Sequence, residues 1–282
     1  MKHLMVLILT LFIVLIIGCE NSSDSQKTTN ASEQRSQLSK LANEQETDKE
    51  DKNRNGPKSG QIDTALYYFC KHNYEKELYD NKIVWRVNDI TFIANKSNLE
   101  EKHTSDTIID SMTIEKGNRK YDIKLDEKPI SISSLGLSAS NEYLAVNAFY
   151  HYGYKVIIIN LNSGEYFILN EYLKSNREGF VETIHAYNWS PDSNKLAFSF
   201  GNTSKSRLAI YNLNNKTFSF IPAENDYITT AYILWHKDGK GLDFISEYPS
   251  NHYKLYRYYF NRDYIVKIMD VERDDLLKLL RV

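Results

Sequence analysis

The sequence is poor in cysteine, glycine and proline. Its 282 residues include two cysteines, 11 glycines and 5 prolines. Two cysteines are too few for a disulfide-stabilised scaffold, and no disulfide is expected. No stretch matches a phosphate-cradling glycine loop, a His-Glu-x-x-His zinc motif, a Cys-x-x-Cys pair or a Gly-x-Ser-x-Gly nucleophile elbow. The sequence therefore gives little reason to expect catalysis, and it predicts neither a cofactor nor a metal site.

The sequence also lacks an excess of positive charge. Lys and Arg together number 35, and Asp and Glu number 37, which gives a formal net charge of −2. A protein that binds nucleic acid normally carries a basic excess, because it must neutralise phosphates. No nucleic-acid partner is expected.

One apolar run stands out, at residues 4–17, behind the basic Lys2. A membrane-spanning helix needs about 20 apolar residues, so this run is marginal for one, whereas its layout is typical of a signal peptide. The run ends in Ile-Ile-Gly-Cys at residues 16–19, which resembles a lipobox. The resemblance implies cleavage between Gly18 and Cys19, acylation (palmitate) of Cys19, and a lipid anchor on the extracytoplasmic face of the cell membrane. The alternative is an uncleaved N-terminal anchor helix, which would also place the rest of the chain outside the cytoplasm.

Composition divides the rest of the chain. Residues 19–60 contain no aromatic residue and few apolar ones, so they cannot bury enough surface to offset the entropy of ordering. This segment is predicted to be a flexible tether, with a short helix at 33–50 as an option. All 21 tyrosines follow residue 61. Residues 61–282 are therefore predicted to form the folded domain, with Cys70 as a small buried apolar residue.

Short runs rich in β-branched and aromatic residues predict strands in this domain. The runs lie at residues 155–161, 165–169, 195–200, 207–213 and 217–221. Tight hairpin turns are expected at residues 162–164 and 214–216, because Asn and Gly tolerate the positive φ that such turns require.

These strands repeat along the sequence. Residues 137–146 (LSASNEYLAV) align without a gap on residues 189–198 (WSPDSNKLAF), 52 positions later. A third copy begins at Trp235, and a weaker fourth copy is expected to begin at Trp85. Repeats of about 50 residues with four short strands each are typical of β-propeller blades, which bury their faces against one another.

The segment WSPDSNKLAF closely resembles the Trp-Ser-Pro-Asp-Gly-Lys-x-Leu-Ala-Phe signature of TolB-like and WD40-like propeller repeats, with Ser193 in place of the glycine. The resemblance implies an all-β, β-propeller-like domain of about four blades, or five with help from residues 61–80, in which the tryptophan packs between blades. A β-sandwich or an open meander is the alternative. Residues 270–282 predict a short amphipathic C-terminal helix that caps the sheets or docks elsewhere.

Two groups of side chains are candidates for a site. His151, His185, His236 and His252 fall at comparable edges of different repeats and could join Asp192 or Asp238 around a metal, although His236 occupies a turn position where a solvated polar residue suffices. Tyrosines in the loops at residues 149–154 and 247–253 could form an exposed binding face, since tyrosine combines a rigid ring with a polar tip. The tyrosines of this face are Tyr150, Tyr152, Tyr154, Tyr248 and Tyr253.

The sequence thus predicts a membrane-anchored lipoprotein of the cell envelope that acts as a non-catalytic protein-interaction or ligand-binding module. Its expected partners are the membrane, through the lipid, and an envelope protein or cell-wall component. Two alternatives stay open: an envelope hydrolase or enzyme accessory with acidic or histidine residues in the propeller channel, and a glycan or small-molecule sensor with aromatic residues clustered in a groove.

Overall fold

The computed structural model describes residues 62–69, 75–98, 107–175, 181, 183–202, 206–222, 229–262 and 264–279. The chain divides into two units, residues 1–55 and 56–282, and every described residue lies in the second. The predicted signal peptide, Gly18, Cys19, the tether at 19–60, the helix at 33–50 and Cys70 lie outside the described residues. None of the helices in the described part is both long and apolar enough to cross a membrane.

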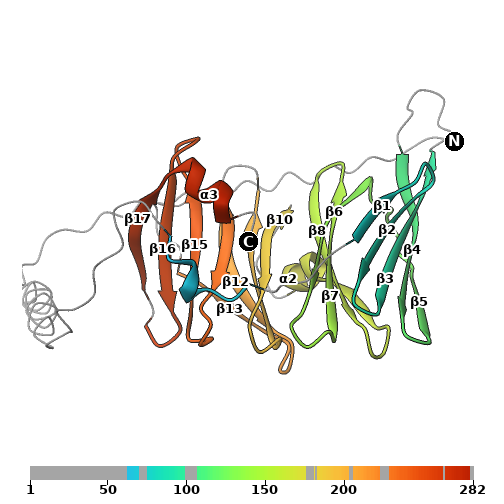
Figure 1. The fold of residues 1–282 in the computed structure, drawn as a ribbon, viewed down its shortest axis with the longest axis horizontal. Helices are drawn as coiled ribbons and strands as arrows, with labels where there is room; N and C mark the ends of the chain where they lie inside the picture. Colours follow the sequence, from blue (N-terminus) through green and yellow to red (C-terminus); the bar gives the residue numbers. More distant parts are fainter. Residues whose placement is uncertain are drawn as a thin grey trace, which may run out of the picture. The chain divides into compact units, whose positions relative to one another are not determined.

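The described residues form four antiparallel sheets, and the strands of each sheet follow one another in chain order (Figure 1). Sheet 1 contains β1 (Glu75–Leu78), β2 (Lys82–Val87), β3 (Ile90–Asn98), β4 (Thr107–Lys116) and β5 (Arg119–Ile123). Sheet 2 contains β6 (Ser131–Leu137), β7 (Tyr143–Tyr150), β8 (Gly153–Asn160) and β9 (Tyr166–Ile168). Sheet 3 contains β10 (Thr183–Trp189), β11 (Lys195–Gly201), β12 (Ser206–Asn212) and β13 (Thr217–Phe220). Sheet 4 contains β14 (Thr229–Trp235), β15 (Gly241–Glu247), β16 (Tyr253–Tyr259) and β17 (Ile265–Val271).

The sequence repeat corresponds to these sheets. Leu137, Trp189 and Trp235 each end the first strand of their sheet, and Trp85 lies in β2, which confirms the fourth copy. The strand β1 is an addition to sheet 1. Residues 62–80 therefore do not supply a fifth sheet within the described part of the chain, because β1 joins sheet 1 and residues 62–69 lie against sheet 4.

The turn after each of these residues explains why the Pro-Asp-Gly signature can vary. The glycine position of the signature has a positive φ in three repeats: 57° at Asn141, 61° at Ser193 and 68° at Gly239. Asn and Ser are short polar residues that can enter this region at a modest cost. In the hairpins, positive φ falls on Gly164, as expected, but on Lys216 rather than on an asparagine.

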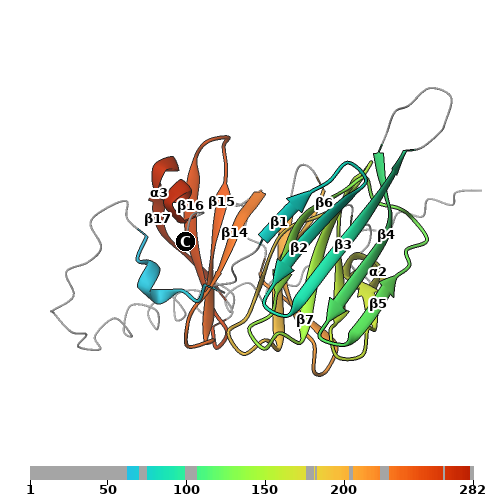
Figure 2. The same ribbon diagram turned by 45° about the vertical axis from the view of Figure 1, so that its right-hand side comes forward.

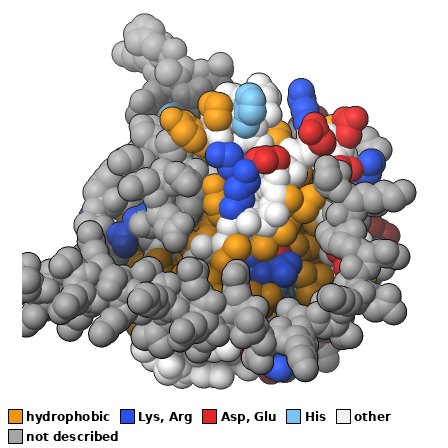
Figure 3. All heavy atoms as spheres, turned by 90° about the vertical axis from the view of Figure 1, so that its left-hand side faces the viewer, with side chains coloured by type: hydrophobic (Ala, Val, Ile, Leu, Met, Phe, Trp, Pro, Cys, Tyr) orange, Lys and Arg blue, Asp and Glu red, His pale blue; other side chains and the backbone are white. Residues whose placement is uncertain are grey.

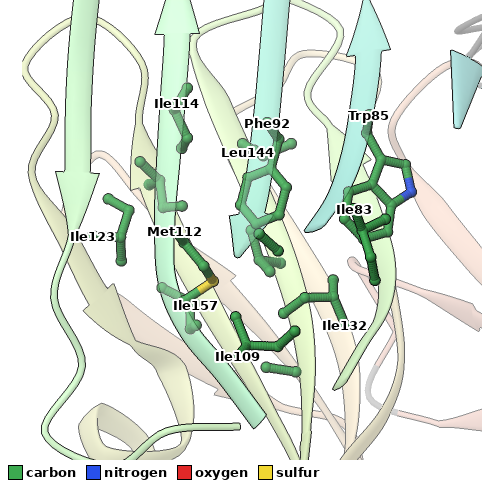
Figure 4. Close-up of a cluster of buried hydrophobic side chains, with 14 of the residues drawn as sticks. Ile83, Trp85, Phe92, Ile109, Met112, Ile114, Ile123, Ile132, Leu144 and Ile157 are labelled. Carbon is green, nitrogen blue, oxygen red and sulfur yellow. The ribbon is translucent and has the colours of Figure 1, made fainter. Parts of the chain in front are cut away.

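Each sheet packs against the next through an apolar core. Between sheets 1 and 2, Trp85, Phe92 and Met112 meet Leu144 and Ile157 (Figure 4). A second core joins sheets 2 and 3 around Trp189, and a third joins sheets 3 and 4 around Trp235. This arrangement buries both faces of the internal sheets, as expected for repeats that are stabilised by packing against their neighbours.

The repeated tryptophans also connect neighbouring sheets by hydrogen bonds. Trp189 Nε1 donates to the carbonyl of Gly136 in sheet 2 at 2.8 Å, and Trp235 Nε1 donates to the carbonyl of Asn188 in sheet 3 at 3.0 Å. The expectation that these residues pack between blades is confirmed.

The far face of sheet 4 is covered by both ends of the described chain rather than by another sheet (Figures 1 and 2). The N-terminal segment, residues 62–69 with the 3-10 helix η1 (Thr64–Leu66), adds to the end of β14: Tyr68 N donates to Trp235 O at 2.8 Å. The helix α3 (Arg273–Leu279) buries Leu276 and Leu279 in the same core. The predicted C-terminal helix thus caps sheet 4, but it starts later than residue 270, because Asp270 and Val271 pair with β16.

The sequence reasoning missed one helix, α2 (Leu169–Ser175), between β9 and β10. Leu169 and Leu173 are four residues apart and both buried, and Glu171 and Lys174 lie in the first and last turns, where they favour the helix dipole. The helix was hard to find because seven residues give only two turns of periodicity. Its position beside sheets 2 and 3 shapes the site described below.

Candidate functional site: tyrosine loops and an aromatic pocket

The first predicted tyrosine loop is only partly exposed. Tyr152 is 45% exposed and Tyr154 is half-buried, but Tyr150 is 1% exposed. Tyr150 is buried because its side chain belongs to the apolar core between sheets 1 and 2. The ammonium of Lys155 lies 4.8 Å from the centroid of its ring and 5.4 Å from that of Tyr152. Tyr150 therefore does not contribute to an exposed face.

Lys155 is fully engaged by its neighbours. Its Nζ donates to Glu127 Oε2 at 3.1 Å and to Glu171 Oε1 of α2 at 3.3 Å, and the Tyr152 hydroxyl donates to Glu127. Burial alone would lower the pKa of Lys155, but the hydrogen bonds to Tyr152 and Glu127 outweigh it and raise the pKa. Burial raises the pKa of Tyr150 to about 12. The ammonium and carboxylate groups of this cluster pair with one another, so they order the loop instead of offering a proton donor or acceptor near neutral pH. The buried hydroxyl of Tyr150 has no hydrogen-bond partner among the described residues.

The second tyrosine loop lies two sheets away. Tyr248 is 47% exposed and Tyr253, in β16, is half-buried. Both loops join the second and third strands of the repeat, in sheets 2 and 4, so they lie at equivalent edges with sheet 3 between them. No ring contact or hydrogen bond within the described residues joins the two groups, so they are two separate surfaces.

The predicted histidines do not converge. Nowhere in the described part of the chain do three or more His, Cys, Asp or Glu residues form a group that could hold a metal ion. His151, His185 and His252 are exposed. His236 is 3% exposed, which corrects the expectation of a solvated turn residue. The equivalent Ser138 and Ser190 are buried too, because their hydroxyls accept the backbone N–H that closes the turn.

His236 belongs to a buried polar cluster around Asp243, whose side chain is wholly inaccessible to solvent. Asp243 Oδ1 lies 2.8 Å from His236 Nε2, and Arg257 donates to both carboxylate oxygens at 2.9 Å. The hydroxyl of Tyr67 donates to Oδ2 at 2.6 Å. Burial alone would raise the pKa of Asp243, but hydrogen bonds from His236, Arg257 and Tyr67 outweigh it and hold the pKa below its usual range.

The role of this cluster follows from its place in the repeat. Asp243 takes the register position that Ala197 and Ala145 hold in sheets 3 and 2, where alanine packs against the next sheet. Sheet 4 has the N-terminal segment on that face, and Tyr67 of this segment bonds to the carboxylate. The His–Asp pair resembles half of a catalytic triad, but both residues are enclosed, so the cluster fixes the N-terminal segment and does not reach a substrate.

A more open cavity, of about 440 Å³, lies between sheets 2 and 3 at the edge opposite to the tyrosine loops. Half of its lining residues are aromatic, and we call it the aromatic pocket. It is lined by Tyr143, Ile158, Asn160, Glu165, Tyr166, Phe167, Tyr172, Tyr211, Leu213 and Lys216. Its volume lies within the range of small-ligand sites, roughly 300–1,000 Å³.

The pocket wall is built from packed rings. Tyr172 of α2 meets Tyr211 edge-on, with ring centroids 5.8 Å apart, and Phe167 lies 5.6 Å from both. Burial, with a smaller contribution from the nearby Tyr172 hydroxyl, raises the pKa of Tyr211 to about 12. Tyr211 therefore remains protonated at neutral pH, and it offers the pocket an aromatic ring and a hydroxyl instead of a base or nucleophile. Glu165 and Lys216 are the exposed charges of its lining.

The sequence indicates this pocket through aromatic residues at positions where the aligned repeats differ. Tyr143 and Phe167 lie where the aligned copy carries Lys195 and Ser219. Aromatic residues at positions that vary between repeats are candidates for function, whereas the shared positions maintain the fold.

No family model matches this chain, and no curated protein matches it. Solved structures resemble it in fold. TolB from Acinetobacter baumannii is 16% identical over 62% of this chain and 41% of its own, with a TM-score of 0.38. The β-propeller domain of the Trilobed protease from Pyrococcus furiosus is 11% identical over 64% and 54%, with a TM-score of 0.43. Dipeptidyl peptidase 4 from Porphyromonas gingivalis is 10% identical over 72% and 38%, with a TM-score of 0.45. The chain thus spans about two fifths of the first of these structures.

TolB and a β-propeller domain are thus among the structures that the chain is similar to. Its own structure is all-β, with four antiparallel sheets of four or five strands in chain order, and each sheet packs on the next in the manner of β-propeller-like repeats.

Proposed function

We propose that the protein is a lipid-anchored lipoprotein of the extracytoplasmic membrane face, and that its propeller-like domain is a non-catalytic module that binds a ligand or an envelope partner. The observation that carries the binding role is the aromatic pocket. It is open and preformed, and its lining combines aromatic rings with a few polar groups, which is the usual composition of a recognition site.

The described residues favour binding over hydrolysis. The pocket contains a single carboxylate, Glu165, and no histidine, cysteine or serine. Acid–base hydrolysis requires a positioned acid and base, or a nucleophile with its base, within hydrogen-bond reach of the substrate. The one buried His–Asp pair, His236 and Asp243, has both carboxylate oxygens occupied by other protein groups.

The anchor is tested by intact-mass and membrane-partition analysis of the wild type beside Cys19→Ala. Acylation of Cys19 predicts a wild-type mass with the lipid and without residues 1–18, and partition into the membrane fraction. Cys19→Ala should lose both properties. If the variant keeps the wild-type mass and partition, the lipoprotein proposal is wrong.

The binding role is tested by crosslinking and capture from envelope fractions, with variants of exposed tyrosines as probes. Tyr152→Ala and Tyr248→Ala alter the two loops, Tyr172→Ala alters the pocket, and Tyr264→Ala is the matched control. Tyr264 is as exposed as Tyr152, at 45%, but lies outside all three places. A stoichiometric envelope component should be captured by the wild type and by the control, and lost in at least one of the other variants. Capture that no site variant reduces would contradict the proposal.

A further inference from the structure

The aromatic pocket has a counterpart one repeat later. A groove of about 260 Å³ lies between sheets 3 and 4, and we call it the sister groove. Five of its lining residues follow residues of the pocket lining by 52 positions: Lys195, Ile210, Asn212, Thr217 and Ser219. Strand pairing fixes the correspondence, because Tyr143 pairs with Asn160 in sheet 2 as Lys195 pairs with Asn212 in sheet 3. The sister groove is lined by Lys195, Ile210, Asn212, Asn215, Thr217, Ser219, Ile221, Tyr258 and Phe260.

The sister groove contains its own cation. The ammonium of Lys195 lies over the ring of Phe260, 5.6 Å from its centroid, which is the geometry of a cation–π contact. The chain therefore places an ammonium group against an aromatic wall at this position of the repeat.

The aromatic pocket differs from the sister groove in a consistent direction. At the position of Lys195 it has Tyr143, which removes the internal cation. At the positions of Thr217 and Ser219 it has Glu165 and Phe167, which add a negative charge and a ring. The helix α2 adds Tyr172 to this pocket. The formal charge of the lining therefore falls from +1 in the sister groove, from Lys195, to zero in the aromatic pocket, from Glu165 and Lys216, and the number of aromatic residues rises from two to five.

We propose that the aromatic pocket binds the ammonium group of a ligand. This ammonium would take the place in the repeat that the ammonium of Lys195 has in the sister groove. This inference deepens the proposed function, on which it rests, by naming the chemistry of the ligand. The faces of aromatic rings attract an ammonium group, and the carboxylate of Glu165 adds attraction. Lys216, on the same lining, disfavours a ligand with several positive charges and suits an anionic group carried beside the ammonium.

The test uses two probes of equal shape and different charge. Choline and its uncharged carbon isostere 3,3-dimethylbutan-1-ol are titrated into the full-length protein in detergent, and binding is followed by calorimetry and tyrosine fluorescence. The proposal predicts one site for choline, with an affinity at least about tenfold higher than for the isostere. A third titration, with N-acetyl-lysine methylamide, distinguishes a peptide side chain from a small quaternary ammonium as the source of the cation. Equal affinity for choline and the isostere would overturn the proposal. So would binding of a hexose by a protein that binds neither choline nor N-acetyl-lysine methylamide.

Variants locate the site. Tyr143→Lys gives the pocket the residue of the sister groove, and its new ammonium should compete with choline and abolish binding. Glu165→Gln, at an exposed position, should weaken choline binding about three- to tenfold without altering the fold. Lys195→Met removes the cation of the sister groove and is the matched control, with unchanged affinity expected. If Glu165→Gln and a folded Tyr143→Lys both bind choline as the wild type does, the assignment of the pocket is wrong.

The outcome is distinguishable from failure of the proposed function. If no cation binds while envelope capture still depends on a site variant, the inference about the ammonium falls and the binding module stands. If choline binds but nothing from the envelope is captured, the pocket assignment stands and the partner proposal falls.

Discussion

Removal of one hydroxyl, by Tyr67→Phe, tests how the N-terminal segment is held on sheet 4. Tyr67 is 2% exposed, and its hydroxyl donates to Asp243 Oδ2 at 2.6 Å across 176 residues of sequence. Phenylalanine keeps the ring, which also packs near Phe69 and His236, and removes only this donor.

The magnitude follows from the burial of the acceptor. A hydrogen bond to a charged group contributes about 1.5–3 kcal/mol, and a buried acceptor that loses a donor cannot recover it from water. Asp243 retains its bonds to His236 and Arg257, so its charge stays compensated. We therefore expect Tyr67→Phe to reduce the free energy of unfolding by about 2 kcal/mol, below the roughly 3–5 kcal/mol cost of breaking a buried ion pair.

The assay is urea unfolding followed by tryptophan fluorescence, since Trp235 lies beside the segment. Limited proteolysis of residues 62–69 gives a local measure, because a repeat domain can open sheet by sheet. Tyr79→Phe is the matched control: its hydroxyl donates to Glu77 at the same 2.6 Å, but Tyr79 is 46% exposed, so water replaces the lost bond. Equal midpoints for the wild type and Tyr67→Phe, or equal shifts in both variants, would refute the assignment of the segment to this contact.

Three further predictions concern pH and turns. Asp243 has a lowered pKa in the folded state, so the stabilisation that it gives is present above a pH of about 4 and is lost as the pH falls through the folded pKa. The free energy of unfolding of Asp243→Asn should therefore change less between pH 6 and pH 3 than that of the wild type, as measured by urea titration at each pH. Gly164→Ala should lower stability by about 2–3 kcal/mol in thermal unfolding, because φ is +78° and the new Cβ would lie 2.2 Å from Tyr121 Cδ1; a loss below about 0.5 kcal/mol would contradict this. Lys216→Gly should raise stability by about 0.5–1 kcal/mol in the same assay, since glycine relieves a φ of 57°, and a decrease would count against the turn assignment.

Much of the fold could be predicted because each repeat contains its own local information. The 52-residue offset placed the strands around Trp189 and Leu137 without any long-range information, and it extended to Trp85, where the similarity is weak. The helix α2 was missed and the start of α3 was placed too early, because short helices next to strands give few turns of periodicity.

The candidate sites were harder to predict because they depend on contacts between distant residues. Tyr67 and Asp243 are far apart in sequence, and only the intrusion of an acidic residue into Leu242-Asp243-Phe244 hinted at a special role. Tyr150 was expected on a surface, but it packs into the core between sheets 1 and 2, which a count of aromatic residues cannot reveal. The lipid anchor at Cys19 stays a prediction, because it lies outside the described residues.

The cover on sheet 4 has a consequence for biogenesis. Its apolar core draws on Ile62 and Tyr67 from the start of the domain and on Leu276 and Leu279 from α3 near residue 280. Figure 3, which views the side of the molecule where β17 and α3 lie in Figure 1, shows hydrophobic side chains there among charged ones. During synthesis, sheets 1 to 3 can form as they emerge, but this core cannot close until α3 has emerged. A chain stopped before α3 exposes an apolar sheet face, which a protease or chaperone can recognise.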